Sequence, residues 1–221
     1  VISGNDNSLF PFSGRGDGSF VRSQLQNMPS SGRGKDAADV NGDGNADLVV
    51  GTGTSNLYFY GGNGDGTFKP SQTIAHGFSD LYGVTLADYD NDGLIDIVAS
   101  DSNGAGALYF FKGKGDGSFQ PALFTGIDLD SYVPSDNFDF ESDGIMDLVV
   151  ARANFNTVHW LKGDGDGTFT SPANTIIGPS FGSSRFGISA PTPSRAIPIS
   201  VQPNSSFVLE LQLDTSLPAV V

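Results

Sequence analysis

One seven-residue phrase occurs four times in the chain, and this repetition constrains the fold more than any other feature. The phrase has the form Gly-x-Gly-Asp-Gly-(Ser/Thr)-Phe, and its final phenylalanines lie 48, 51 and 50 residues apart, at Phe20, Phe68, Phe119 and Phe169. A nine-residue acidic phrase recurs three times with nearly the same spacing. Because two independent phrases share one period, we expect a tandem array of one structural unit.

Short apolar runs of strand length lie between the two phrases. Each acidic phrase is followed by a run such as residues 48–50 and then by an aromatic run such as residues 57–60. Runs that are apolar at every position are typical of strands buried on both faces. The Asp-Gly pair predicts a tight hairpin with positive φ at both central residues, after which the phenylalanine starts the returning strand. With one strand ahead of each acidic phrase, the pattern predicts four short strands per repeat and no helix.

A four-stranded unit of this length, buried on both faces, is what a blade of a β-propeller requires. We therefore predict an all-β fold, a partial β-propeller or fragment built of four-stranded antiparallel blades. A β-sandwich would not demand the same turn at a fixed period. The predicted units are a partial blade with strands two to four at residues 1–34 and blades with an acidic loop at 35–80, 81–130 and 131–178. Residues 179–221 are either a degenerate repeat without the acidic loop or the start of an immunoglobulin-like module.

The overall charge of the chain is strongly acidic, with a formal net charge of −14. Such a chain repels phosphate backbones and anionic lipid headgroups, so we expect neither nucleic-acid binding nor a basic membrane-binding patch. No apolar run approaches the roughly 18 residues of a membrane span, so we expect no membrane insertion. Cysteine is absent, which excludes disulfides and thiolate metal sites. Cations become the natural partners of this chain.

The acidic phrase places oxygen ligands on alternate residues, which suits a hard cation. In the form Asp-x-Asp-x-Asp-Gly-x-x-Asp, the side chains at positions 1, 3, 5 and 9 and the carbonyl at position 7 can converge, while glycine at position 6 permits a sharp turn. The predicted ligands are Asp39, Asn41, Asp43, the Asn45 carbonyl and Asp47 in the first loop, Asp88, Asp90, Asp92, the Leu94 carbonyl and Asp96 in the second, and Asp139, Glu141, Asp143, the Ile145 carbonyl and Asp147 in the third.

These all-oxygen, histidine-free sites favour Ca²⁺ over Zn²⁺ or Cu²⁺, so we expect about three calcium sites. They differ from an EF-hand, because the last acid falls at position 9 and a strand follows it. The alternative is that the loops are ordinary Asp/Asn/Gly turns. Since several carboxylates held close together repel one another, a bound ion is expected to stabilise each blade.

The repeat resembles the FG-GAP/VCBS family, the calcium-binding propeller repeats of integrin α-chain heads and of many secreted bacterial and fungal proteins. The segment Asp-Leu-Val-Val-Gly at residues 47–51 resembles the family's stretch from the last metal ligand into its Gly-Ala-Pro, although Thr-Gly follows here where Ala-Pro is usual. Tyr82-Gly83 and Phe186-Gly187 resemble its Phe-Gly. The resemblance is good from residue 1 to about residue 178 and weak beyond it. It implies a secreted or cell-surface propeller stabilised by calcium.

The sequence favours a non-catalytic, extracellular, calcium-stabilised adhesion or binding module whose inter-blade loops meet a protein or glycan ligand on the cell surface or matrix. A carbohydrate-binding lectin is one alternative, and an accessory propeller of a secreted lyase or hydrolase is another. The sequence contains no nucleophile elbow, His-rich metal site or phosphate loop, so we expect no enzyme. Trp160 is expected at a packed strand position, with carbohydrate stacking as the alternative. Arg15-Gly16-Asp17 belongs to the repeated phrase, so we interpret it as turn chemistry and not as an adhesion motif.

Overall fold

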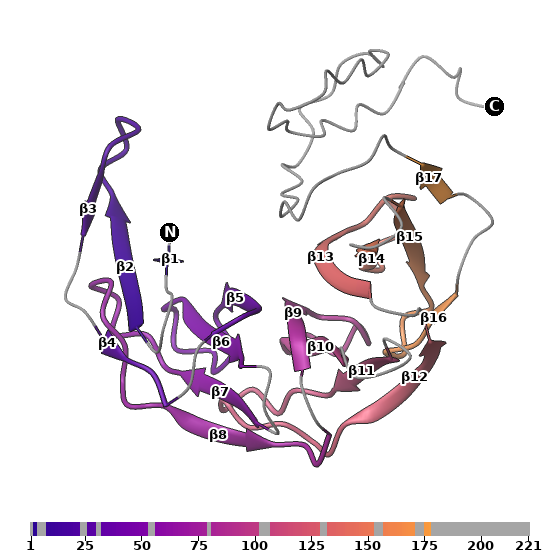
Figure 1. Ribbon diagram of the computed structural model, residues 1–221, viewed down its shortest axis with the longest axis horizontal. Helices are drawn as coiled ribbons and strands as arrows, with labels where there is room; N and C mark the ends of the chain where they lie inside the picture. The colour runs from indigo at the N-terminus through magenta and orange to yellow at the C-terminus, as the bar shows by residue number, and fades with distance from the viewer. Residues whose placement is uncertain are drawn as a thin grey trace.

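The computed structural model describes residues 2–3, 8–22, 26–29, 32–52, 56–78, 81–101, 107–128, 132–152, 157–170 and 175–177. Within these ranges the chain forms β-strands and no helix, and the strands assemble into four antiparallel sheets. The sheets follow one another along an arc (Figure 1). The prediction of an all-β fold built of successive antiparallel sheets is therefore confirmed. The segment 179–221, predicted as a degenerate repeat or a separate module, lies outside the described residues.

The first sheet is centred on one long strand, which pairs with the other three. Its strands are β1 (Ile2–Ser3), β2 (Ser8–Gly14), β3 (Phe20–Arg22) and β4 (Gln26–Asn27). In the partial blade predicted at residues 1–34, β1 corresponds to the second strand of the repeat.

The second and third sheets are four-stranded meanders in which each strand pairs with the next along the chain. The second consists of β5 (Lys35–Ala38), β6 (Asp47–Gly51), β7 (Asn56–Tyr60) and β8 (Gln72–Ala75). The third consists of β9 (Leu81–Ala87), β10 (Asp96–Asp101), β11 (Ala107–Phe111) and β12 (Leu123–Asp128). Their registers agree, because Leu48 pairs with Tyr60 in one sheet and Ile97 with Phe111 in the other.

The fourth sheet follows the same path with one additional short strand. It consists of β13 (Tyr132–Phe138), β14 (Asp147–Arg152), β15 (Thr157–Gly163), β16 (Phe169–Thr170) and β17 (Thr175–Ile177). Both β16 and β17 pair with different parts of β15.

The described part of the chain holds no helix of the length and apolarity that a bilayer crossing requires.

The apolar cores lie between the sheets. Val49 of β6 packs with Ile97 of the third sheet, whereas its neighbours Leu48 and Val50 pack with Leu9 of the first. In the same way, Val98 of β10 joins a core shared with the fourth sheet. Consecutive residues of a central strand thus enter opposite interfaces, and every residue of β6 is buried. This explains why the central strands are apolar at every position, and it confirms that prediction.

The first strands of successive sheets lie on the inner side of the arc, while β8 and β12 run along its outer edge (Figure 1). Side chains link the inner strands directly. Asp36 of β5 accepts a hydrogen bond from the Leu86 N–H of β9 at 2.8 Å, and Asn137 Nδ2 of β13 donates to the Leu86 carbonyl at 3.2 Å. One residue of β9 therefore joins three consecutive sheets.

The hairpins differ from the predicted two-residue Asp-Gly turn, and that prediction is wrong. In the second sheet Gly62 pairs with Phe68 across a five-residue loop. The positive φ angles belong to Gly64 (79°) and Gly66 (85°), the glycines on either side of Asp65. Asp65 Oδ1 instead accepts hydrogen bonds from the Thr67 N–H at 2.9 Å and the Thr67 hydroxyl at 2.6 Å. The aspartate closes the turn through its side chain, so it does not need a left-handed backbone.

Candidate metal centre

The three acidic loops connect the first and second strands of the second, third and fourth sheets. Two positions of each loop have a left-handed backbone. At position 6 this residue is glycine in every loop, with φ near 84° in Gly44, Gly93 and Gly144, as the sequence predicted. At position 4 the left-handed residue is Gly42 in the first loop, Asn91 (φ 57°) in the second and Ser142 (φ 56°) in the third. The sequence did not reveal this second left-handed position.

The acid at position 9 begins the second strand and is buried in each loop: Asp47, Asp96 and Asp147. In the second loop, Asp96 Oδ2 accepts the Tyr89 N–H at 2.9 Å and Oδ1 accepts the Gly113 N–H at 2.8 Å. The equivalent bonds recur in the first and third loops. Each of these carboxylates therefore joins the start of its loop, the second strand and the hairpin of its own sheet. Burial raises the pKa of Asp96 to about 6 and raises that of Asp147 as well.

The acid at position 1 holds the loop backbone in its turn. Asp88 Oδ1 accepts the Asp92 N–H at 3.1 Å, and Asp88 Oδ2 accepts the Gly93 N–H at 2.8 Å. Asp39 and Asp139 make the same pair of bonds to positions 5 and 6 of their loops. The carboxylate at position 1 therefore fixes the backbone of positions 5 and 6 from within the loop.

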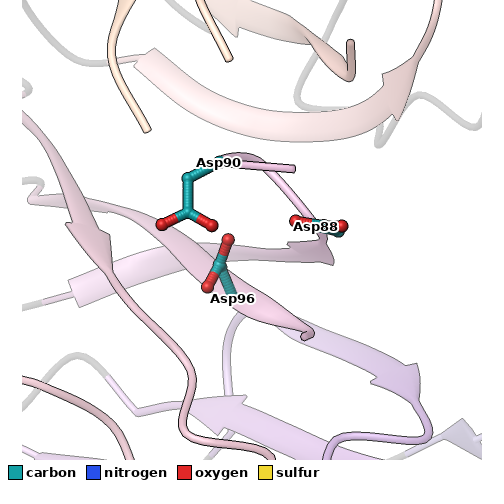
Figure 2. Close-up of side chains that lie close together, drawn as sticks. All are labelled: Asp88, Asp90 and Asp96. Carbon is teal, nitrogen blue, oxygen red and sulfur yellow. The ribbon is translucent and has the colours of Figure 1, made fainter. Parts of the chain in front are cut away.

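Three carboxylates of the second loop converge. Oxygen atoms of Asp88, Asp90 and Asp96 lie within 4.8 Å of one another, and their side chains face one another in Figure 2. The Asp90 side chain is only 9% exposed, and its Oδ1 has no hydrogen-bond partner among the described residues. A buried carboxylate oxygen without a partner is costly, and a cation placed between the three acids would supply one. The residues present therefore fit a metal ion.

The side chains of Asp92 and Leu94, the other two predicted residues of the second loop, make other contacts. Asp92 Oδ1 accepts the Leu94 N–H at 2.9 Å, while its Oδ2 lies 2.7 Å from Lys112 Nζ. The Leu94 side chain packs under the hairpin, where a Cβ added to Gly115 would lie 2.9 Å from Leu94 Cδ2. The residue at position 7 packs against the hairpin in all three repeats, because Asn45 and Ile145 lie in the same way beneath Gly64 and Gly165.

The first and third loops do not gather three carboxylates in this way within the described ranges. In the first loop, position 3 is Asn41, which donates from Nδ2 to Asp47 Oδ1 at 3.3 Å and accepts the Asp43 N–H at 2.9 Å. In the third loop, Glu141 is paired with Lys162. The structure thus places the predicted residues in three similar loops but brings acids together most closely around Asp90.

One lysine ammonium contacts each acidic loop, a feature that the sequence analysis missed. Lys112 Nζ bonds to Asp90 Oδ2 and Asp92 Oδ2, Lys162 Nζ pairs with Glu141 and with Asp143 Oδ2 at 3.2 Å, and Lys69 Nζ lies 3.3 Å from Asp43 Oδ2. Lys112 lowers the pKa of Asp92, and the acids in turn raise the pKa of Lys112. The signal in the sequence was a lysine beside the hairpin glycine or phenylalanine of each complete repeat.

Two other sequence features have local explanations in the structure. Asp17 Oδ1 accepts the Ser19 N–H at 2.8 Å and the Ser19 hydroxyl at 2.6 Å, which is the same turn contact that Asp65 makes in the second sheet. Trp160 of β15 is half-buried, with its ring 5.5 Å from that of Phe140. The Arg-Gly-Asp sequence therefore occupies a repeat hairpin, and Trp160 lies in the sheet.

Comparison with known proteins supports the fold. No curated protein matches the chain. A solved structure describing recognition of non-reducing terminal N-acetylglucosamine by an Agrocybe aegerita lectin matches with a TM-score of 0.51 at 21% identity, over 79% of this chain and 47% of that one. A protein of unknown function from Desulfotomaculum acetoxidans DSM 771 matches with a TM-score of 0.49 at 14% identity, over 77% of this chain and 48% of that one. The chain thus spans about half the length of these proteins.

A match to a protein-family model assigns the chain to a family. The model for the FG-GAP-like repeat matches residues 39–99 and 139–190, which together make up more than half of the chain. The matched residues include all three acidic loops and all or most of the strand that follows each loop directly. The resemblance seen in the sequence is confirmed: the chain belongs to the family of FG-GAP-like repeat proteins.

Proposed function

We propose that the second acidic loop binds Ca²⁺ and that the chain is a calcium-stabilised, non-catalytic binding module. The observation that carries the metal assignment is the Asp90 carboxylate, whose buried Oδ1 has no partner among the described residues and which lies in a cluster with two further carboxylates. Membership of the FG-GAP-like family supports it, because such repeats often bind calcium.

The spacing of the three acids suits calcium in particular. Calcium–oxygen distances are about 2.3–2.6 Å, so two ligands of one calcium ion lie at most roughly 5 Å apart. The oxygens of Asp88, Asp90 and Asp96 lie within 4.8 Å of one another, inside that limit. Magnesium demands shorter distances in a stricter octahedron, and zinc prefers nitrogen or sulfur ligands. The backbone bonds to Asp88 and Asp96 do not exclude an ion, because a carboxylate oxygen has more than one lone pair.

A bound calcium ion would supply positive charge where three chain segments meet. Asp88 lies at the end of the first strand, Asp96 begins the second strand, and Asp96 also holds the Gly113 N–H of the hairpin. The chain's own residues therefore fix the ligands from three directions, and an ion would offset the repulsion between them. The loops at residues 39–47 and 139–147 are proposed as further sites with the ligands predicted above.

The test is calorimetric titration of calcium into the wild-type protein and into Asp90→Asn. We expect the variant to lose one site or to bind at least about tenfold more weakly, because a charged ligand is removed. Asp116→Asn is the matched control, since it removes one charge from an exposed hairpin of the same sheet while keeping an oxygen that accepts from Ser118. Absence of calcium uptake by the wild-type protein would contradict the assignment.

For the ligand of the module, we propose a protein or glycan in the calcium-rich extracellular medium. A carbohydrate-binding role is the second candidate. It is supported by the matching lectin and by a run of aromatic rings, in which Phe78 and Tyr109 lie 3.9 Å apart and Tyr109 and Phe124 lie 6.0 Å apart. Phe124 is 54% exposed and presents an apolar ring face of the kind that packs on a sugar.

A glycan array probed in calcium distinguishes these possibilities. Saturable binding of the wild-type protein that is lost in Phe124→Ala supports the lectin role, because this exposed ring contributes little to the core. Trp160→Ala tests the other aromatic candidate in the same assay. If no glycan binds, a protein ligand or an accessory role beside a secreted lyase or hydrolase remains the proposal.

A further inference from the structure

The lysine at each acidic loop is supplied from two different positions of the repeat. In the third and fourth sheets it precedes the first hairpin glycine, as Lys112 and Lys162, whereas in the second sheet it follows the hairpin phenylalanine, as Lys69. These two positions face each other across the hairpin. The Lys69 N–H donates to the Gly61 carbonyl at 2.7 Å, and the Gln120 N–H donates to the Lys112 carbonyl at 2.8 Å.

The two routes deliver the ammonium to the same part of the loop. In the second sheet, where the lysine follows the hairpin phenylalanine, the residue that precedes the hairpin is Gly61. A Cβ added to Gly61 would lie 3.1 Å from Lys69 Cδ. The Lys69 stem thus runs over the backbone at Gly61 and reaches Asp43, the acid at position 5. Lys112 and Lys162 reach the same position 5 from the other strand, at Asp92 and Asp143. Every complete repeat therefore places an ammonium at position 5 of its loop.

The lysines contact the acids that each loop offers at positions 3 and 5. The second and third loops have an acid at position 3, and their lysines contact positions 3 and 5 together. The first loop has Asn41 at position 3, and Lys69 contacts the acid at position 5, with 53% of its side chain exposed. The lysines thus act as counter-charges to the loops and do not simply pack against the sheet.

We propose that these lysines are built-in counter-ions that hold the acidic loops closed without metal and compete with calcium for the carboxylates at positions 3 and 5, thereby setting calcium affinity. This inference rests on the proposed calcium function. Asp90 is where this competition is expected, because its Oδ2 bonds to Lys112 while the same carboxylate lies in the cluster with Asp88 and Asp96. An ion drawing on both oxygens displaces the ammonium, since two cations cannot share one carboxylate without repulsion.

The experiment uses Lys112→Met, with Lys114→Met as the matched control. Lys114 is exposed on the hairpin, where its charge acts on Asp116, so its replacement removes the same charge from the same sheet. In chelator, we expect Lys112→Met to melt at a lower temperature than the wild type and the control. In calcium titrations, we expect it to bind about tenfold more tightly, which corresponds to one or two weakly screened ion pairs.

Lys69→Met extends the test to a lysine whose side chain is 53% exposed. Its gain in affinity should be smaller than that of Lys112→Met. Unchanged or weaker calcium binding in both variants overturns the competition. If the wild-type protein takes up no calcium, the calcium function fails separately, and the counter-ion role is then decided by the melts in chelator: equal melting temperatures of Lys112→Met and Lys114→Met overturn it.

Discussion

Gly167, in the hairpin of the fourth sheet, lies directly on the ring of Phe110 in the third sheet, where a Cβ added to the glycine would come within 2.4 Å of Phe110 Cε1. The Gly167 N–H also donates to the Tyr89 carbonyl of the third sheet at 3.2 Å. Gly117 lies on Phe59 of the second sheet in the same way, with a Cβ distance of 2.7 Å. The last glycine of the repeated phrase therefore serves both the turn and the contact between neighbouring sheets.

Replacing Gly167 by alanine should destabilise the protein more than the same change at Gly18 in the first hairpin. Gly167→Ala meets the Phe110 ring and also places alanine at φ 82°, so we expect a loss of about 2–4 kcal/mol. Gly18→Ala is the control, since Gly18 has φ 86° but nothing within 4 Å of its added Cβ. It should cost only about 1 kcal/mol. Urea denaturation of both variants checks the difference, and equal losses would show that the contact with Phe110 is unimportant.

Removing calcium should lower the melting temperature of the wild-type protein. If each site binds with a dissociation constant of about 10⁻⁴ to 10⁻³ M, millimolar calcium adds roughly 0.4 to 1.4 kcal/mol per site. The effect should be modest, because backbone N–H groups and lysines already offset part of the charge in the loops. Thermal melts in excess calcium and in excess chelator measure it. Superimposable melts would rule out a stabilising role for calcium.

The buried Asp96 predicts a pH dependence of stability in chelator. Burial raises the pKa of Asp96 from 3.8 to about 6. Between these two pH values, the folded protein keeps a proton on Asp96 that the unfolded chain has released. The stabilising contribution is present below about pH 4 and is lost as the pH rises through about 6. The raised pKa values of Asp36 and Asp147 act in the same direction.

The pKa values of Asp43 and Asp92 are lowered, so the charged forms of these two carboxylates stabilise the folded protein. This contribution to stability is lost only in more acidic solution, as the two groups become protonated. Melting temperatures of the wild type and Asp96→Asn across pH 4 to 7 provide the check. The decline between about pH 4 and 6 should be weaker in the variant. Identical slopes would mean that Asp96 titrates normally.

The hydrogen bond from the Leu86 N–H to Asp36 should contribute to the cohesion of the second and third sheets. Asp36→Ala leaves the buried N–H of Leu86 without its acceptor, so we expect a loss of about 1–3 kcal/mol. Asp36→Asn retains an acceptor oxygen and should lose less. Chemical denaturation of the two variants measures the difference. If alanine and asparagine have the same effect, the hydrogen bond is not what joins these sheets.

Much of the fold could be predicted because its determinants are local and repeated. The apolar runs at residues 48–50 and 97–99 indicated strands covered on both sides, and glycine at position 6 indicated a left-handed turn. The hairpins were predicted incorrectly, because the sequence does not show that Asp65 closes its turn through the side chain while the flanking glycines take positive φ. An Asp-Gly pair alone is compatible with both arrangements.

The sequence by itself determined a periodic array of four-stranded units with acidic loops, since spacing and residue type are sufficient to specify strands, turns and candidate ligands. Only the tertiary structure decided which groups meet. Asp96 reaches the Gly113 N–H, and Lys112 reaches Asp90 and Asp92, because the third strand and its hairpin fold back over the loop. These contacts join residues 17 to 22 positions apart, so they depend on strand pairing and not on local preference. Strand pairing therefore sets the charge around each candidate metal site.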